Sequence, residues 1–191
     1  MVKQSAATAG EGAATHVGLL RGVNLGPSRR LAMSDLRAFL TSLGFGQVQT
    51  VLQSGTFVFT GGRKSPASLE QLLEAASARG LRMETEVFVR TASEWDTLIK
   101  RNPFPAEALR DPSHVLATAL KDPPTARAIE ALTKFHHGPE PFVVDGRVAY
   151  AYYPEGIARS KLALAMDTKL GTRGTARNWN TVLKLAALVG L

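Results

Sequence analysis

The chain of 191 residues contains no cysteine. Disulfide bonds and thiolate metal sites are therefore excluded, and the composition is compatible with a reducing compartment. No apolar run approaches the roughly 18 residues that a membrane-spanning helix requires. Residues 1–14 also lack the apolar block of a secretory signal. We therefore expect a cytoplasmic protein without membrane contacts, whose first fourteen residues form a mobile tail.

Residue patterns that typify catalytic or metal sites are also scarce. The four histidines show none of the spacings of zinc motifs. Arg21-Gly22-x-x-x-Gly26 follows an apolar segment, but it lacks the Gly-Lys-Ser/Thr of a nucleotide-binding P-loop. We assign no catalytic residue and expect no metal or cofactor. Enzymatic activity and oligomeric state stay open.

Acidic residues are nearly missing from two segments, and this concentrates the positive charge. The formal net charge is +7. Residues 159–184 contain six Lys or Arg and one acid, Asp167, whereas residues 16–34 contain three arginines and no acid. If the fold brings the two segments together, they form one site for an anion. The alternative is two separate basic loops in solvent; we expect the shared site.

Hydrophobic periodicity predicts regular structure through the first half of the chain. Apolar residues at helical spacing, with Ser34 as the N-cap and Gly44 as the stop, predict a helix over residues 34–43. We expect the other elements to be strands at residues 16–20, 48–52, 56–60 and 83–89 and helices at 66–78 and 93–100. Up to residue 89, this is the β-α-β-β-α-β order of a ferredoxin-like unit.

The second half begins the same order again. Asp145-Gly146 between two apolar runs is a strong hairpin signal. The expected elements are strands at residues 114–120, 142–144 and 147–153 and helices at 123–133, 160–170 and 180–189. The proline-containing segment 102–112 is the expected domain boundary. We therefore predict an α+β protein of two ferredoxin-like halves, residues 15–101 and 102–191, with mixed or antiparallel sheets backed by helices and packed on each other.

Two expected helix starts lie in the basic C-terminal segment, and an arginine precedes each of them. Unpaired N–H groups and the positive end of the helix dipole favour anions there. We expect a pocket between the halves for a phosphorylated or otherwise anionic small molecule, held by bidentate arginines and oriented by amides. The predicted ligand-binding residues are Arg21, Gly22, Asn24, Gly26, Arg159, Ser160, Lys161, Arg177, Asn178 and Asn180.

Three other functions compete with anion binding. Phe57 and Phe59, two residues apart on a strand, could stack on bases in a nucleic-acid-binding module, although large aromatic side chains more often belong to the core. An enzyme acting on a phosphorylated metabolite would use Glu155 or Tyr153 as an acid or base. A structural or oligomerising protein would have its arginines fully paired within the protein.

Five separate motifs match one family in order and spacing. They are Leu19-Leu20-Arg21-Gly22-Val23-Asn24-Leu25-Gly26, Gln53-Ser54-Gly55-Thr56, Asn102-Pro103-Phe104, Tyr152-Tyr153-Pro154-Glu155-Gly156-Ile157-Ala158-Arg159-Ser160-Lys161-Leu162 and Thr175-Ala176-Arg177-Asn178-Trp179-Asn180-Thr181. From His16 onward the chain resembles the bacterial family called domain of unknown function 1697. It departs from the family pattern at Leu25, Thr56 and Ala158. The resemblance implies a cytosolic α+β protein with ferredoxin-like halves, and no established activity, catalytic residue or cofactor.

Overall fold

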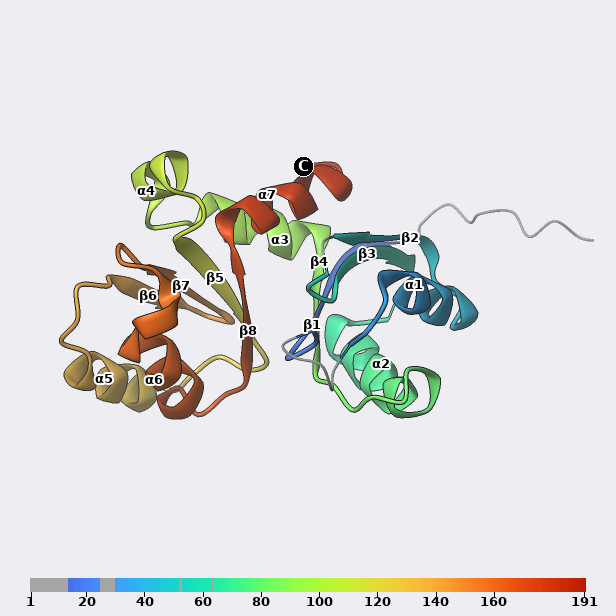
Figure 1. Cartoon of the computed structure of the whole chain (residues 1–191), viewed down its shortest axis with the longest axis horizontal. Coiled ribbons are helices and arrows are strands. Elements are labelled where there is room, and N and C mark those ends of the chain that lie inside the picture. The colour runs from blue at the N-terminus through green and yellow to red at the C-terminus, as the bar shows by residue number, and fades with distance from the viewer. Residues whose placement is uncertain (1–13, 25–29, 52, 63) are drawn as a thin grey trace, which may run out of the picture.

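The computed structural model of the chain describes residues 14–24, 30–51, 53–62 and 64–191. Two four-stranded antiparallel sheets are arranged with their helices on the outside (Figure 1). Each half of the chain contributes one sheet and follows the β-α-β-β-α-β order. The predicted α+β fold with two βαββαβ-type halves is thus confirmed, and both sheets are antiparallel rather than mixed.

The first half forms a sheet with the strand order β2-β3-β1-β4. Its elements are β1 (Ala14–Leu20), α1 (Met33–Ser42), β2 (Gly46–Val51), β3 (Thr56–Gly61), α2 (Pro66–Gly80) and β4 (Val87–Thr91). Gly44, with a φ of 86°, follows α1 as expected. The expected N-cap at Ser34 is wrong, because α1 starts one residue earlier with Ala32 as an N-cap that makes no side-chain hydrogen bond. Ala14 belongs to β1, and the rest of the predicted tail lies outside the described residues.

The second half forms a sheet with the strand order β6-β7-β5-β8. Its strands are β5 (Val115–Leu120), β6 (Phe142–Asp145), β7 (Val148–Tyr152) and β8 (Gly174–Asn178). The helices that follow β4 are α3 (Ala92–Lys100), α4 (Pro105–Arg110), α5 (Ala126–Phe135), the 3₁₀ turn η2 (Ile157–Arg159), α6 (Lys161–Lys169) and α7 (Trp179–Leu188). The sequence did not predict α4 or β8. β8 lacks the apolar alternation of a strand, and only its pairing with β5 makes it one.

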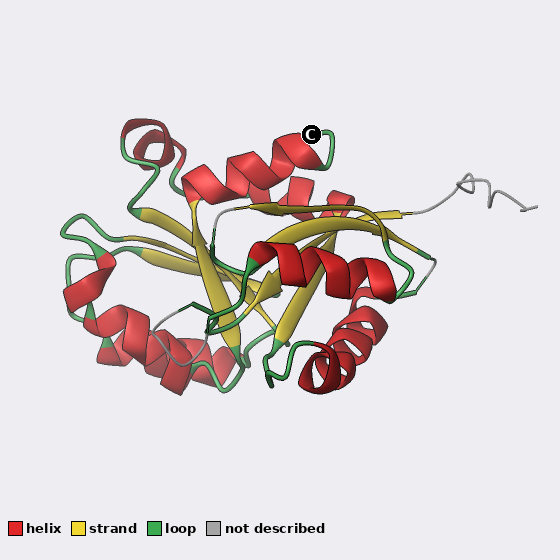
Figure 2. Cartoon of the chain, turned by 45° about the vertical axis from the view of Figure 1, so that its right-hand side comes forward, coloured by secondary structure: helices red, strands yellow, loops and turns green. Residues whose placement is uncertain are grey.

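Strand alternation divides the interior into three hydrophobic cores. In β1, Val17 and Leu19 face a central core that also receives β5, β7, α3 and α7, whereas Leu20 faces the core beneath α1 and α2. The third core lies between the second sheet and helices α5 and α6. Helices α3 and α7 lie together at one end of both sheets (Figures 1 and 2), and Trp95 of α3 donates a 3.1 Å hydrogen bond to the Val182 carbonyl of α7. The two halves therefore share one core, across the predicted domain boundary.

A buried ionic network joins the two halves at the open edge of β4. Glu70 of α2 is 5% exposed and accepts a 2.8 Å hydrogen bond from the Val89 amide. Its carboxylate also pairs with Arg90 at 3.4 Å, Lys121 at 3.1 Å and Arg147 at 3.4 Å. Because Lys121 and Arg147 belong to the second half, the network fixes the position of that half beside β4.

A candidate ligand-binding cleft between the two halves

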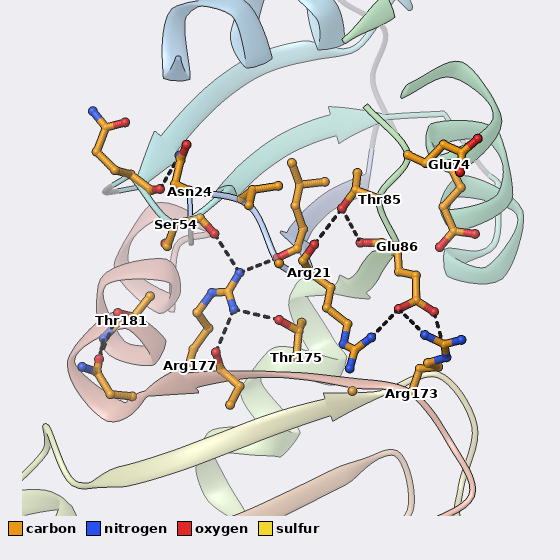
Figure 3. A pocket seen from close by; sticks show the side chains of 18 of the residues that line it. Arg21, Asn24, Ser54, Glu74, Thr85, Glu86, Arg173, Thr175, Arg177 and Thr181 are labelled. Carbon is orange, nitrogen blue, oxygen red and sulfur yellow. Dashed lines mark hydrogen bonds and ion pairs between the residues drawn. The ribbon is translucent and has the colours of Figure 1, made fainter. Parts of the chain in front are cut away.

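A cleft of about 1260 Å³ separates the ends of β1 and β4 from β8 (Figure 3). It receives side chains from both halves of the chain, as the shared-site prediction required. Its described lining residues are Leu20, Arg21, Gly22, Val23, Asn24, Gln53, Ser54, Glu74, Glu84, Thr85, Glu86, Ile157, Arg173, Gly174, Thr175, Ala176, Arg177, Asn178 and Thr181. The volume is slightly above the usual range of small-molecule sites.

Arg177, on the edge strand β8, is the main polar link across the cleft. Its guanidinium donates five hydrogen bonds, all to neutral oxygens, and forms no ion pair with a carboxylate of the described residues. In the first half it bonds Thr56 Oγ1 at 2.7 Å and the carbonyls of Leu20 and Ser54 at 3.0 Å each. Burial lowers the pKa of Arg177 to about 10, so the side chain is still charged at neutral pH.

Arg21 follows β1 directly and reaches acidic groups from both halves. Its Nη1 lies 2.9 Å from Glu86 Oε2, and its Nη2 lies 2.6 Å from Asp167 Oδ1 on α6. Burial acts to lower the pKa of Arg21, but hydrogen bonds and charge interactions with Glu86 and Asp167 outweigh it and the pKa is raised. Arg173, on the chain leading to β8, approaches Glu86 at 3.5 Å. Two ion pairs therefore cross from one half to the other beside the cleft.

The formal charges of the described lining residues balance, whereas the sequence predicted a basic pocket. Three arginines (Arg21, Arg173 and Arg177) face three glutamates (Glu74, Glu84 and Glu86). The charges are nevertheless not evenly placed. Glu74 pairs with Lys121 at 2.6 Å, and Glu86 is shared by two arginines. Arg177 is the lining arginine whose charge has no carboxylate contact among the described residues.

The turns around the cleft depend on backbone conformations that few residues adopt readily. Gly22 and Asn24 have φ values of 68° and 57°, a region that glycine and asparagine tolerate best. The Asn24 side chain donates to the carbonyls of Leu31 at 3.1 Å and Gln53 at 2.6 Å, and it accepts from the Leu31 amide at 2.7 Å. Asn24 thus ties the loop after β1 to the β2–β3 turn, and its amide is occupied by the protein.

The cleft contains only part of the predicted ligand set. Arg21, Gly22, Asn24, Arg177 and Asn178 line it, and Asn178 caps α7 by accepting from the Thr181 amide at 3.1 Å. The other predicted residues are not in the described lining: Arg159, Lys161 and Asn180 are exposed, Ser160 caps α6 by accepting from the Leu162 amide, and Gly26 lies outside the described residues. The turn at η2 directs Arg159 into solvent.

Comparison with known proteins places the chain in a family. The family described as "Protein of unknown function (DUF1697)" matches residues 13–150, well over half of the sequence. The chain belongs to the DUF1697 family. The matched range contains the first three motifs of the resemblance, and the last two lie beyond it. A search of the curated proteins finds no match for this DUF1697 protein.

A solved structure has the same arrangement of elements. It is titled "The structure of conserved bacterial protein SP0830 from Streptococcus pneumoniae" and superimposes with a TM-score of 0.71. The match covers 92% of this chain and 98% of that chain at 21% sequence identity. At this identity the likeness establishes the fold, including the pairing of the two halves, and says nothing about a ligand.

Several residues of the DUF1697 cleft were missed by the sequence analysis. Glu86 and Thr85 come just before β4, where no motif marks them. Arg173 was counted only as part of the basic segment. Thr56 and Thr175, both within resemblance motifs, bond the Arg177 guanidinium. Both threonines belong to motifs that the chain shares with the family, so the sequence offered a signal for them. Glu86 belongs to no motif, and its role follows only from packing between residues distant in sequence.

The residues behind the competing functions lie outside the described cleft. Phe57 and Phe59 are fully buried beneath α1 and α2, so they cannot stack on bases. Tyr153 is 3% exposed, and burial, together with the Glu140 charge, raises its pKa to about 12. Glu155 is exposed and is not in the described lining. Within the described part of the chain, no acidic and histidine side chains gather into a metal site, and no helix could cross a bilayer.

Proposed function

We propose that this DUF1697 protein is a cytoplasmic binding protein for a small organic anion, a phosphorylated or carboxylated molecule, in the cleft between its halves. Arg177 carries the proposal. Its charge is held at the cleft by five hydrogen bonds to neutral oxygens, without a carboxylate contact among the described residues. A fixed cation at a site partly shielded from water attracts an anion more strongly than an exposed one does.

Arg21 and Arg173 would supply the donors that bind the anion directly. All five N–H groups of Arg177 are already used, so its contribution is the charge rather than a new hydrogen bond. Arg173 is 66% exposed at the side chain, and its two contacts with the Glu86 carboxylate are both long, at 3.5 Å, so it can turn toward an anion at little cost. Bidentate arginine contacts suit both phosphate and carboxylate.

The test is a thermal-shift screen with inorganic phosphate, nucleotides, sugar phosphates and dicarboxylates, each against its neutral analogue at equal ionic strength. An anion at about a hundred times its Kd should stabilise the protein by about 2.7 kcal/mol, a rise in Tm of about 5–10 °C. The Arg21→Gln and Arg173→Gln variants should weaken binding at least about tenfold, the effect of about 1.4 kcal/mol.

Arg159→Gln is the matched control, because Arg159 is an exposed arginine outside the described lining. It should bind as the unmodified protein does. Equal stabilisation in all three variants would place the anion elsewhere, and the absence of stabilisation by every anion would refute the proposed function.

A further inference from the structure

A second cavity, the side pocket, lies beside the cleft, between α6 and the outer face of the second sheet. Its volume is about 110 Å³. Part of its wall belongs to the hydrophobic core beneath α6 and comes from Leu120, Tyr153, Ala163, Met166 and Leu170. The cleft and the side pocket share the wall residues Ile157, Gly174 and Ala176. The two cavities therefore have part of the edge strand β8 as a common wall.

The residues that β8 contributes to the side pocket are small. Alternation along the strand places Gly174 and Ala176 on the face opposite to Thr175 and Arg177. A Cβ atom on Gly174 would lie 2.7 Å from Thr118 Cγ2 and 2.9 Å from Leu120 Cδ2, so position 174 cannot take a side chain without displacing the pocket wall. Thr175 and Arg177 thus lie on one face of the strand, and the small residues that line the side pocket lie on the other.

The side pocket lies beside the arginines of the cleft. Asp167 lines the side pocket, and its Oδ1 lies 2.6 Å from Arg21 Nη2. On the other side, the carbonyl of Ala176 accepts a 2.7 Å hydrogen bond from Arg177 Nη1. An anion next to Arg21 and Arg177 would therefore be adjacent to an apolar cavity.

We propose that the cleft selects amphipathic anions, in which a phosphate or carboxylate is joined to a short aliphatic chain that enters the side pocket. A water molecule occupies about 30 Å³ in the liquid, so the pocket holds roughly three or four carbon atoms. The wall is mostly apolar, so transfer of the ligand's aliphatic chain from water into the pocket lowers the free energy. This inference rests on the proposed function and adds the nature of the group attached to the anion.

The test is calorimetric titration with inorganic phosphate and the straight-chain alkyl phosphates from methyl to hexyl. Each methylene that enters the side pocket should tighten binding about fourfold. The gain should stop near propyl or butyl phosphate, where the pocket is full. Inorganic phosphate has no alkyl chain, so its affinity measures the contribution of the arginines alone.

Two substitutions reduce the side pocket without touching the arginines. Ala163→Leu fills it from α6, and Thr118→Ile narrows it from β5, in case one of them folds poorly. With either change, the affinity for alkyl phosphates should no longer rise with chain length. The affinity for inorganic phosphate should stay within about twofold of that of the unmodified protein. Ala187→Leu is the same change at an exposed position on α7. In this variant the affinity should rise with chain length as it does in the unmodified protein.

The outcomes separate the two proposals. Arg21-dependent binding of inorganic phosphate with no gain from longer chains would overturn the side-pocket inference and leave the proposed function standing. An unchanged chain-length gain in both pocket variants would also overturn the inference, since the chain would then lie elsewhere. Failure of inorganic phosphate, of every alkyl phosphate and of the straight-chain carboxylates from acetate to hexanoate to bind would overturn both.

Discussion

Arg177 shows how one residue can serve the fold and the site together. Its guanidinium meets three oxygens of the first half and two of β8. Carbonyl and hydroxyl oxygens satisfy its N–H groups but leave the charge without a counter-ion among the described residues. Burial of a charge costs free energy unless hydrogen bonds compensate it, and here they also join the two halves.

Replacing Arg177 by Met should destabilise the protein by about 3 kcal/mol, because several polar groups at the half-to-half contact lose their donor. Urea unfolding would measure the change. Arg159→Met is the control: Arg159 is exposed and has no partner among the described residues, so a change within about 0.5 kcal/mol is expected. Equal losses in the two variants would contradict the structural role of Arg177.

His16 is a second residue whose surroundings predict a measurable effect. It is 1% exposed, stacks on Phe59 at 5.3 Å between ring centroids, and leaves Nδ1 without a hydrogen bond among the described residues. Burial lowers its pKa, and a hydrogen bond with the Ala14 backbone and the charge of Glu94 oppose this only in part. The folded protein therefore keeps His16 neutral.

Stability should consequently fall as the pH drops below the ordinary histidine pKa of about 6.5, because the unfolded chain then binds a proton that the folded chain rejects. The loss from this one group is at most about 1.4 kcal/mol per pH unit and ends below the lowered pKa. Chemical denaturation at pH 7.5, 6.5 and 5.5 should show a shallower pH dependence for His16→Asn than for the unmodified protein. Identical slopes would mean that His16 does not titrate differently on folding.

At the level of the elements, β1 is the centre of the first sheet. It pairs with β3 on one side and β4 on the other, and its register places Gly18 opposite Phe57. A Cβ atom at Gly18 would lie 2.3 Å from Phe57 Cε2 and Cζ. The Phe57 ring thus fills the space over Gly18, and the register of the strand and the packing of the core depend on each other.

Gly18→Ala should therefore destabilise the protein by about 2–3 kcal/mol through overpacking. Adding Phe57→Leu to Gly18→Ala should restore part of the lost free energy of unfolding. A double-mutant cycle should give a coupling free energy of at least about 0.5 kcal/mol. Gly62→Ala, where no atom lies within 4 Å of the added Cβ, should change stability by less than about 0.5 kcal/mol. Strict additivity of the two β1–β3 substitutions would contradict the close contact.

In the whole molecule, the shared central core and the Glu70 network make the halves interdependent. Lys121 donates to Glu70, Glu74 and the Val87 carbonyl, so side chains occupy the open edge of β4. Arg90, 3% exposed, bonds the Leu120 carbonyl of the second half at 2.6 Å. Burial, together with the nearby charge of Arg147, lowers the pKa of Arg90 to about 10, although Glu70 opposes the shift.

Glu70→Gln should destabilise the protein by about 3 kcal/mol, because three cations lose the carboxylate that they share. Glu130→Gln removes an exposed pair with Lys134 and should cost less than about 0.5 kcal/mol. Urea unfolding monitored by tryptophan fluorescence and by far-UV circular dichroism should give coincident single transitions for the unmodified protein. Two separate transitions would show that the halves unfold independently.

Local patterns in the sequence were sufficient for most of the fold. Apolar periodicity predicted the strands and helices of both halves apart from α4 and β8, and Gly44 and Asp145-Gly146 marked turns that local backbone preferences define. The expectation that Phe57 and Phe59 belong to the core was also confirmed. These features depend on residues close together in the sequence, so the sequence alone could reveal them.

Only the tertiary structure decided the composition of the cleft. Asp167, counted within the basic segment, lies against Arg21, which is 146 residues away, and Glu86 meets both Arg21 and Arg173. Arg159 and Lys161, equally basic in sequence, turn to solvent. The sequence determined which segments are charged and which residues are buried in regular elements. Which charges meet depends on how the two sheets pack around a common core, and this long-range packing leaves no local pattern.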